Sequence, residues 1–513
     1  MRDSAVLIVG AGPTGLALAC DLARRNVDFR VIDKAPVYFA GSRGKGLQPR
    51  TLEIFDDFGV INRILSQGRF HLPFRAYDGA NVLGERDLYE ACHPTPDVPY
   101  ESPLIIPQWR VEETLRALLE NGNKRVELST ELVSINPDNK GVTATVEVNG
   151  TREQIRCQYL IGADGGRSFV RKYMEFGFEG ETWENARMFV GDVCVAGLDR
   201  DHWHTWPNHP DGWVGLCPLP STQSFQFQAG IPPEAEDQSP TLEIFQRIFE
   251  ERTGRTDLKL SNATWLSLYR VNIRMVNRYR NGRVLLAGDA AHIHSPVGGQ
   301  GMNTGIQDSY NLGWKLGLVL NGANPSLLDT YEEERLPVAA SVLGITTRLS
   351  REFQTMKTYL PRTSETLQLG ISYRHSSLSD PRNSAINGLS AGDRAPDGPL
   401  TDAKREPARL FDLFRGPHFT ILVFDGAAFD QCKKLVGRYP RILRCYLVTR
   451  DSSRTDSSPQ AFTDEAGLVS QAYSANHSLC LIRPDGYIGW QGDSDSLASL
   501  DVYLSNALGI ANE

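Results

Sequence analysis

A glycine-rich turn between two apolar stretches constrains this chain more than any other feature. The segment is VLIVGAGPTGLALACDLARRNVDFRVID, residues 6–33, and its glycines are Gly10, Gly12 and Gly15. The pattern predicts a strand, a tight turn, a helix and a second strand that ends at Asp33. Glycine favours close approach of a pyrophosphate at Gly10 and Gly12, and close packing of the helix on the sheet at Gly15. An acid at position 33 can accept hydrogen bonds from ribose hydroxyls, so we expect a dinucleotide-binding unit.

The composition narrows the class of protein. A chain of 513 residues is long enough for several domains, and 41% hydrophobic and 23% charged residues are typical of an ordinary globular protein. A net charge of −8 argues against nucleic acid or an anionic membrane as partner and favours a small molecule. The 8 cysteines form no CxxC pair and no zinc-like spacing, and no apolar stretch approaches about 18 residues. We therefore expect a reduced cytoplasmic protein with no metal site and no membrane span.

Shorter patterns predict the remaining elements. Residues 76–100 resemble a hairpin that turns at Asp78 and Gly79, and residues 109–120 carry a helical apolar stripe. Two strands should flank a turn at residues 138–141. Residues 181–270 contain short aromatic-rich segments typical of strands, which predict a second sheet. Residues 395–513 alternate between strand-like and helix-like sequence patterns.

Two further segments separate the candidate dinucleotides. They are GADGGRS, residues 162–168, and GRVLLAGDAAHIHSPVGGQGMNTGIQD, residues 282–308. Asp289 ends a predicted strand and opens a predicted helix, where its carboxylate can accept hydrogen bonds from a polyol chain, which FAD has and NAD lacks. Pro296 and the glycines at 298, 299 and 301 offer bare backbone to a flat ring. Singly these segments could be an N-capped helix and a flexible loop, but together they favour FAD.

At this point the chain resembles the flavoprotein aromatic hydroxylases of the para-hydroxybenzoate hydroxylase fold, in the subgroup with phenol hydroxylase, pentachlorophenol hydroxylase and the polyketide hydroxylases. The resemblance includes SRGKGLQPRTLEIFDDFGV, PQWRVEETL, LLDTYEEERLPVA, GDRAPDGPL and LIRPDGYIGW. It implies an α/β fold in which a Rossmann-like FAD-binding domain (residues 1–75, 101–180 and 271–375) is interleaved with a β-sheet substrate domain (residues 76–100 and 181–270). A linker (residues 376–394) would lead to a C-terminal thioredoxin-like α/β domain (residues 395–513). Because that domain has no paired cysteines, packing or homodimer formation is favoured over disulfide exchange.

The resemblance also implies the cofactor site. Arg43 would reach the pyrophosphate, Gln108 would lie near the flavin edge, and Asp289 would bind the ribityl chain. Asp164 and Gly165 would serve both FAD and the nicotinamide donor. The whole expected cofactor set is Gly10, Gly12, Pro13, Thr14, Gly15, Asp33, Lys34, Arg43, Gln108, Asp164, Gly165, Gly288, Asp289, Pro296, Gly298, Gly299, Gln300, Gly301, Met302 and Asn303.

The implied reaction is hydroxylation of a phenolic or polycyclic aromatic substrate through a flavin hydroperoxide, with O2 as co-substrate and NADPH or NADH as a transient donor. As catalytic residues we expect Pro296, whose carbonyl would help place the substrate ring, together with Tyr269 and Arg270. The chain departs from phenol hydroxylase at Lys45, where that relative has an aspartate before the GLQ segment. The identity of the base that deprotonates the phenol therefore stays open.

Residues 181–270 are expected to supply the pocket wall, with Trp213, Phe225 and Phe227 on strands. His202 and His204, in DHWHTW, are interpreted as solvated histidines among packed aromatic residues rather than as the base.

Three alternative functions are open on the sequence alone. The first keeps FAD and O2 but inserts oxygen into a polyketide ketone, a Baeyer–Villiger reaction. The second is a flavoprotein that binds and stabilises a ligand without oxygenating it. The third, an NAD dehydrogenase, is disfavoured because it would need only the first glycine segment.

Overall fold

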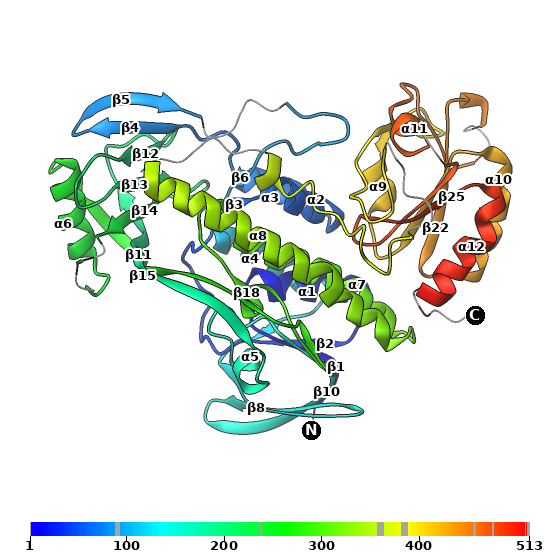
Figure 1. The fold of residues 1–513 in the computed structure, drawn as a ribbon, viewed down its shortest axis with the longest axis horizontal. Helices are drawn as coiled ribbons and strands as arrows, with labels where there is room; N and C mark the ends of the chain where they lie inside the picture. Colours follow the sequence, from blue (N-terminus) through cyan, green and yellow to red (C-terminus); the bar gives the residue numbers. More distant parts are fainter. Residues whose placement is uncertain are drawn as a thin grey trace.

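Three larger β-sheets organise the part of the chain that the structure describes, and they lie side by side in Figure 1. The computed structural model describes residues 2–87, 93–232, 234–235, 238–356, 364–380, 388–454, 458–474, 477–507 and 509. Cys92 and residues 381–387 of the expected linker lie outside this set.

The first sheet is built on the N-terminal glycine segment. Strand β1 pairs in parallel with β2 on one side and with β10 on the other. The strand order is β16-β17-β10-β1-β2-β7, and β9 pairs with β10 and β8. The strands are β1 (Arg2–Val9), β2 (Phe29–Ile32), β7 (Val126–Glu127), β8 (Thr130–Asp138), β9 (Gly141–Val148), β10 (Thr151–Gly162), β16 (Arg280–Asn281) and β17 (Val284–Leu286). The predicted turn at residues 138–141 is confirmed, since it joins β8 to β9.

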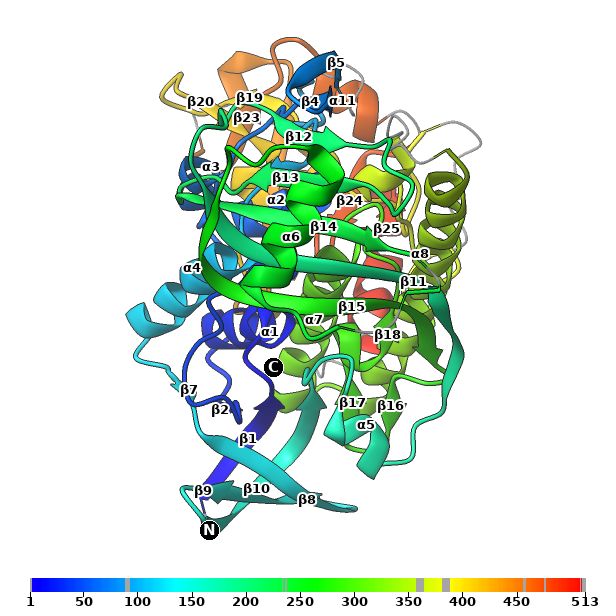
Figure 2. The ribbon, with the colours of Figure 1, turned by 90° about the vertical axis from the view of Figure 1, so that its left-hand side faces the viewer.

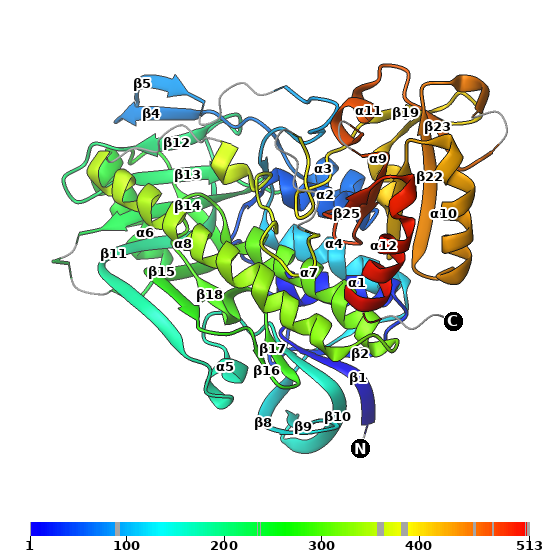
Figure 3. The same ribbon diagram turned by 45° about the vertical axis from the view of Figure 1, so that its right-hand side comes forward.

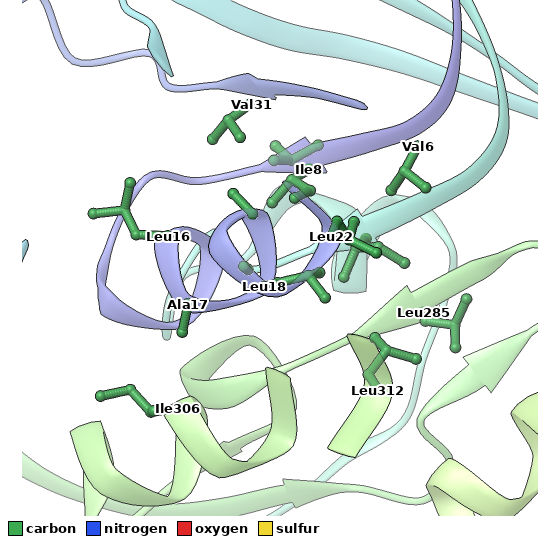
Figure 4. Close-up of a cluster of buried hydrophobic side chains, with 14 of the residues drawn as sticks. Val6, Ile8, Leu16, Ala17, Leu18, Leu22, Val31, Leu285, Ile306 and Leu312 are labelled. Atoms are coloured by element: carbon green, nitrogen blue, oxygen red, sulfur yellow. The ribbon is translucent and has the colours of Figure 1, made fainter. Parts of the chain in front are cut away.

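Helix α1 (Pro13–Arg24) forms the centre of the first core. Figure 4 shows it between the strands that carry Val6, Ile8 and Val31 and the helix α7 (Gly301–Leu320), which carries Ile306 and Leu312. Because α1 is covered on both sides, its residues from Gly15 to Leu22 are all buried. Full burial of each leucine contributes about 1.5–3 kcal/mol, so this layer fixes α1 and α7 firmly on the sheet.

The other helices of this unit surround the same core. They are α2 (Pro49–Asp57), α3 (Ile61–Gln67), α4 (Gln108–Asn121), α5 (Phe169–Tyr173) and α8 (Asp329–Met356), with 3-10 turns η1 (Gly288–Ala290), η2 (Pro325–Leu328) and η3 (Ser364–Leu367). The short strands β3 (Gly46–Leu47) and β6 (Leu104–Ile105) pair with each other. The helix predicted at residues 109–120 is confirmed as α4.

The second sheet is the one predicted from the aromatic-rich region. Its order is β18-β15-β11-β14-β13-β12-β4-β5. The strands are β4 (Phe74–Asp78), β5 (Asn81–Arg86), β11 (Phe178–Val195), β12 (Trp203–Trp206), β13 (Val214–Pro218), β14 (Ser224–Ile231), β15 (Leu260–Val276) and β18 (His292–Ile293). The hairpin predicted near Asp78 and Gly79 is confirmed by the pairing of β4 with β5. Figure 2 shows helix α6 (Leu242–Thr253) lying across one face of this sheet.

The two faces of the second sheet have different neighbours. Phe225 and Phe227 are 1% and 0% exposed, and Phe227 stacks on Phe245 of α6 with ring centroids 4.7 Å apart. Phe225 and Phe227 lie on a strand, as predicted, and they face the core beneath α6. The Gly230 amide donates a hydrogen bond to the Trp213 carbonyl. The Trp213 ring packs edge-on against Phe353 of α8, on the face of the sheet that does not contact α6.

The third sheet forms the C-terminal domain. Its order is β20-β19-β23-β22-β21-β24-β25, with β21, β22 and β23 parallel. The strands are β19 (Pro399–Thr401), β20 (Pro407–Arg409), β21 (Phe419–Val423), β22 (Leu443–Thr449), β23 (Ala461–Thr463), β24 (Leu479–Ile482) and β25 (Ile488–Gly492). The helical elements are α9 (Leu410–Phe414), α10 (Gly426–Arg438), α11 (Leu468–Tyr473), α12 (Leu497–Val502), the 3-10 turns η5 (Ser452–Arg454) and η6 (Ser494–Ser496), and the π-helical turn η7 (Tyr503–Ala507). Cys432, Cys445 and Cys480 are buried free thiols.

A buried ionic network fixes the C-terminal domain to α7 and α8, which run beside it in Figure 3. Arg483 donates to both carboxylate oxygens of Glu334, at 2.6 and 2.9 Å, and to both of Asp485, at 2.6 and 3.0 Å. Lys315 of α7 donates to Glu334 at 2.7 Å, and Trp314 donates to Asp485 at 3.0 Å. Since these side chains are almost completely buried, the C-terminal domain is held rigidly against the first unit.

In the part of the chain that the structure describes, no helix combines the length and the apolar character that crossing a membrane requires.

Candidate cofactor and substrate site

The three glycines of the first turn serve three different purposes. A Cβ at Gly15 would lie 2.0 Å from the Gly10 carbonyl oxygen, so the packing reason predicted for Gly15 is confirmed. At Gly10, where φ is +105°, a Cβ would lie 2.3 Å from the Ala163 carbonyl oxygen. Gly10 therefore allows close approach to the GADGG segment, and its predicted approach to a pyrophosphate stays a prediction. A Cβ at Gly12 would meet nothing within 4 Å, so open space lies at the start of α1.

Asp33 and Lys34 follow β2 at the edge of this turn. The Asp33 carboxylate accepts hydrogen bonds from the amides of Ala11 at 2.8 Å and Ala35 at 2.9 Å. Each oxygen keeps a second lone pair, so Asp33 holds the glycine turn and can still accept a ligand hydroxyl. Lys34 is exposed.

The segment after β2 meets α4 at Gln108. The Gln108 side chain accepts from the Gly44 amide at 3.0 Å and donates to Glu112 at 2.9 Å. Burial raises the pKa of Glu112 to about 7, although the charges of Arg116 and Arg43 oppose the shift. Arg43 is exposed and its charge also lowers the pKa of Asp289, so the guanidinium is within electrostatic reach of both acids.

Asp164 has a structural task inside its own loop. Its carboxylate accepts from the Ser168 hydroxyl at 2.5 Å and from the amides of Phe169 and Val170 at 2.6 and 3.1 Å. It therefore caps α5, the short helix predicted after this strand. Gly165 has φ of +75°, and a Cβ there would meet nothing within 4 Å.

The third segment differs from its predicted secondary structure. Asp289 lies in the single 3-10 turn η1, not at the start of a helix, and the long helix α7 begins at Gly301. Gly288 and Gly305 both permit close contact with Thr14, since a Cβ at either would lie 2.5 or 2.4 Å from the Thr14 hydroxyl. This contact joins η1, α7 and α1 at one place.

Asp289 is an acceptor without a donor in the described residues. Its side chain is exposed, although protein surrounds it closely enough that loss of hydration raises the pKa of its carboxyl. His292 and Arg43 lower that pKa and Asp308 raises it. A Cβ at Gly301 would lie 3.9 Å from the Asp289 carboxylate, which places this acid beside the first turn of α7.

The loop before α7 is held by its carbonyl groups. Gln48 and Gln300 donate to the Gly298 carbonyl at 3.1 and 2.9 Å, and Asn303 donates to the Gly299 carbonyl at 2.9 Å. In the described residues the backbone N–H groups of Gly301, Met302 and Asn303 have no acceptor. Pro296 and Gly299 are exposed, and the Pro296 carbonyl accepts from the Gly299 amide at 3.1 Å.

A buried network beneath this loop was not predicted. Asp308 of α7 accepts hydrogen bonds from the Gly288 amide at 3.0 Å and from Arg335 of α8 at 2.7 Å. The His292 ring also contacts its carboxylate, at 2.7 Å. The two basic neighbours hold the pKa of Asp308 below its usual value in spite of burial. Asp308 thereby fixes η1, which carries Asp289, against α7 and α8. The sequence pattern around Asp308, GIQD, does not reveal this network, because the partners of Asp308 are distant in the chain.

The second sheet brings Tyr269 within electrostatic reach of Asp289. Burial and the nearby charge of Asp289 raise the pKa of Tyr269, so its hydroxyl stays protonated at neutral pH. Trp265, on the same face of β15, packs edge-on against Phe39 with ring centroids 5.8 Å apart. Leu266 and Leu268 pack into the α6 core on the other face, and strand alternation puts the exposed Arg270 on that face. That Tyr269 and Arg270 approach the substrate stays a prediction.

Both histidines of DHWHTW contact other protein groups, and the expectation that they are solvated is wrong for His204. His204 is fully buried, and its ring nitrogens contact the Tyr77 hydroxyl at 2.9 Å and the Asp199 carbonyl at 2.8 Å. His202 contacts the Asp199 carboxylate at 2.8 Å.

Several features of this place fit FAD. Gly12 leaves space at a helix N-terminus, Asp289 offers an exposed carboxylate without a donor, and the first turn of α7 offers N–H groups without acceptors. These are the groups that a pyrophosphate, a polyol and an electron-rich ring edge require, in the order in which FAD carries them.

Known proteins resemble this chain along nearly its whole length. Residues 3–346 match the FAD binding domain family and residues 389–511 match the aromatic-ring hydroxylase C-terminal family. A flavin-dependent monooxygenase of Mycobacteroides abscessus is 44% identical over 95% of this chain and 97% of its own length. Pentachlorophenol 4-monooxygenase of Sphingobium chlorophenolicum is 32% identical over 95% of this chain and 93% of its own.

A solved structure agrees with this assignment. Aklavinone-11 hydroxylase, in a ternary complex with FAD and aklavinone, superposes with a TM-score of 0.83 at 25% identity, covering 99% of this chain and 100% of the other. The chain belongs to the family of FAD-dependent monooxygenases that carry an aromatic-ring hydroxylase C-terminal domain.

Proposed function

We propose that this protein uses FAD, O2 and NADPH or NADH to hydroxylate a phenolic or polycyclic aromatic substrate. The observation that carries the proposal is that Asp289 lies beside the first turn of α7 and within electrostatic reach of Tyr269 of the second sheet. A flavin held by the first two would face an aromatic substrate against the second sheet. The named relatives act on pentachlorophenol and aklavinone, which are aromatic compounds of different size, and this supports the substrate class.

When bound, FAD supplies the redox and oxygen-activating chemistry, and the chain supplies binding and orientation. Gly12 and the start of α1 would face the pyrophosphate, Asp33 the ribose and Asp289 the ribityl hydroxyls. The N–H groups of Gly301, Met302 and Asn303 would stabilise negative charge on the ring edge. Tyr269, which stays protonated, would donate a hydrogen bond to cofactor or substrate.

The aromatic side chains of the second sheet suit a flat substrate. Trp203, Trp213, Trp265 and Tyr269 lie on the face that does not pack against α6. Such faces bind planar rings by stacking and edge contacts. A reducing cytoplasmic location is supported by the buried free cysteines.

The test is purification followed by a substrate screen. The protein should carry a flavin absorption spectrum, and phenols or anthraquinone-like compounds should stimulate its NADPH oxidation. The product should be one oxygen heavier with its ring carbons intact. A protein that cannot take up FAD, or that consumes NADPH without ever forming an oxygenated product, would refute the proposal. An ester product would instead indicate ketone oxygenation.

A further inference from the structure

A buried polar cluster lies where the segment from Ser42 to Gln48 crosses the second sheet. Its members are Lys45, Asp192 of β11, and Gln226 and Gln228 of β14. Asp192 lies directly opposite Gln226 in the sheet, and the two side chains are 1% and 2% exposed. Gln226 and Gln228 are two residues apart, so all three sheet residues point to the face that does not pack against α6.

Hydrogen bonds organise this cluster around Lys45. The Lys45 ammonium donates to the Gln226 side-chain oxygen at 2.5 Å, and Gln228 donates to the same oxygen at 3.0 Å. Gln226 donates to the Ser42 carbonyl. The Lys45 ammonium also lies 4.0 Å above the centre of the Trp203 ring, so one wall beside it is aromatic.

The cluster contains buried acceptors with unused capacity. In the described part of the chain, the side-chain oxygen of Gln228 is buried and makes no hydrogen bond, and the buried Asp192 carboxylate has the hydroxyl and the amide of Ser42 beside it as donors. Unfilled buried acceptors are costly and rare in folded proteins. A ligand that brings hydroxyl groups would satisfy them.

The electrostatic surroundings allow Asp192 to take up a proton. Burial raises the pKa of its carboxyl to about 6, even though hydrogen bonds from the hydroxyl and amide of Ser42 and the charge of Lys45 oppose the shift. The other titratable group in electrostatic contact with it is the buried thiol of Cys217, whose pKa is raised to about 11, so that it stays neutral. Asp192 is therefore ionised at neutral pH and able to accept a proton.

The same segment connects this cluster to the cofactor residues. A Cβ at Gly44 would lie 3.4 Å from Gln108 and 3.6 Å from Met302. Asn303, in the first turn of α7, donates to the Gly46 carbonyl at 3.0 Å and accepts from the Gln48 amide at 2.8 Å. Lys45 thus lies between the residues expected to hold the flavin and the sheet face expected to hold the substrate.

We propose that Lys45 and Asp192 recognise an acidic hydroxyl group of the substrate, a phenol or an enol, and bind it as its oxyanion. The O–H bond of that hydroxyl breaks, its proton passes to an Asp192 carboxylate oxygen, and the Lys45 ammonium pairs with the oxygen left behind. The inference rests on the proposed hydroxylation, because an electron-rich oxyanion makes the ring the better nucleophile. It assigns the proton acceptor to β11 and gives Lys45 a role in a chain that lacks the aspartate of phenol hydroxylase at that position.

The test compares kcat and KM across pH 5 to 9 for FAD-loaded wild type and variants, using a phenol that stimulates NADPH oxidation and its methyl ether. Asp192→Asn should lower kcat/KM for the phenol about 100-fold and remove the fall in kcat/KM below a pH of about 6. Lys45→Met should raise KM at least tenfold, and Lys45→Arg should restore much of that loss. For the methyl ether, which has no proton to give, either change should lower kcat/KM by a much smaller factor than it does for the phenol. Lys140→Met, on an exposed turn, is the matched control.

The outcomes separate this inference from the proposed function. If no phenol is hydroxylated by the wild type, both fail. If the wild type hydroxylates a phenol and Asp192→Asn and Lys45→Met do so equally well, only the present inference fails. If Asp192→Asn, Lys45→Met and Lys45→Arg all lose FAD, as judged by flavin absorbance, the cluster holds the two domains together. That result also overturns the inference.

Discussion

Replacement of Arg483 by methionine should release the C-terminal domain from the rest of the protein. Arg483 is completely buried between Glu334 of α8 and Asp485, which are 0% and 1% exposed. Methionine retains much of the apolar volume of arginine but none of its charge or donors. Lys315 would then be the cation of this network that still offsets the charge of the two buried carboxylates.

The expected magnitude follows from burial. Removing one partner of a fully buried ion pair costs about 3–5 kcal/mol, because the opposite charge stays in the interior without compensation. The Arg483 contacts are short and double on each carboxylate, at 2.6–3.0 Å, so the upper half of that range is expected. The loss should appear as a lower denaturant midpoint in urea unfolding followed by circular dichroism.

An exposed pair provides the control. Arg438 of α10 lies 2.8 Å from Asp501, and these side chains are 44% and 27% exposed. Arg438→Met should cost at most about 1 kcal/mol, since solvent screens such pairs. If Arg483→Met destabilises the protein no more than Arg438→Met does, the argument from burial at this junction is wrong.

Three further predictions concern the cofactor site. Gly15→Ala should lower the Tm of the FAD-free protein, because the new Cβ would overlap the Gly10 carbonyl oxygen. Gly12→Ala should leave that Tm unchanged and weaken FAD binding. Equal losses of Tm in the two variants would contradict this prediction. Burial raises the pKa of Glu112 from 4.5 to about 7, so its contribution to stability is present below pH 4.5 and is lost as the pH rises through 7. That change amounts to about 3 kcal/mol. Glu112→Gln should therefore flatten the decrease in stability between pH 5 and 8, and an unchanged slope would refute this assignment. Asp289→Asn should weaken FAD binding about tenfold or more with no loss of stability in the FAD-free protein, as measured by flavin fluorescence titration.

The local patterns of this chain could be read from its sequence with good success. The helix α4, the β4–β5 hairpin and the turn between β8 and β9 were all predicted, since turn residues and apolar periods act over a few positions. The helix expected at Asp289 was wrong because GDAAH is followed by a short strand pairing with β15, a contact between distant segments.

Contacts between distant segments at the site could not be read from the sequence for the same reason. The close approach of Gly10 to Ala163 involves a strand that begins about 140 residues later. Gln48 and Asn303 could not be matched to each other without the fold, because 255 positions separate them. Alternation along a strand gives two faces and does not say which one is open, so the sequence could not place Phe225 beneath α6.

Trp314 shows that the C-terminal domain shares its core with helix α7 and so is not structurally independent. This residue belongs to α7, the helix whose other end is expected to hold the flavin, yet it is fully buried in the C-terminal core, edge-on to Phe419 at 5.6 Å. A truncation before residue 389 would expose its indole ring and remove Arg483, which would leave Lys315 as the cation paired with Glu334 of α8. Any chimera that exchanges this tail for that of a relative must therefore transplant the matching surface of α7 and α8 as well.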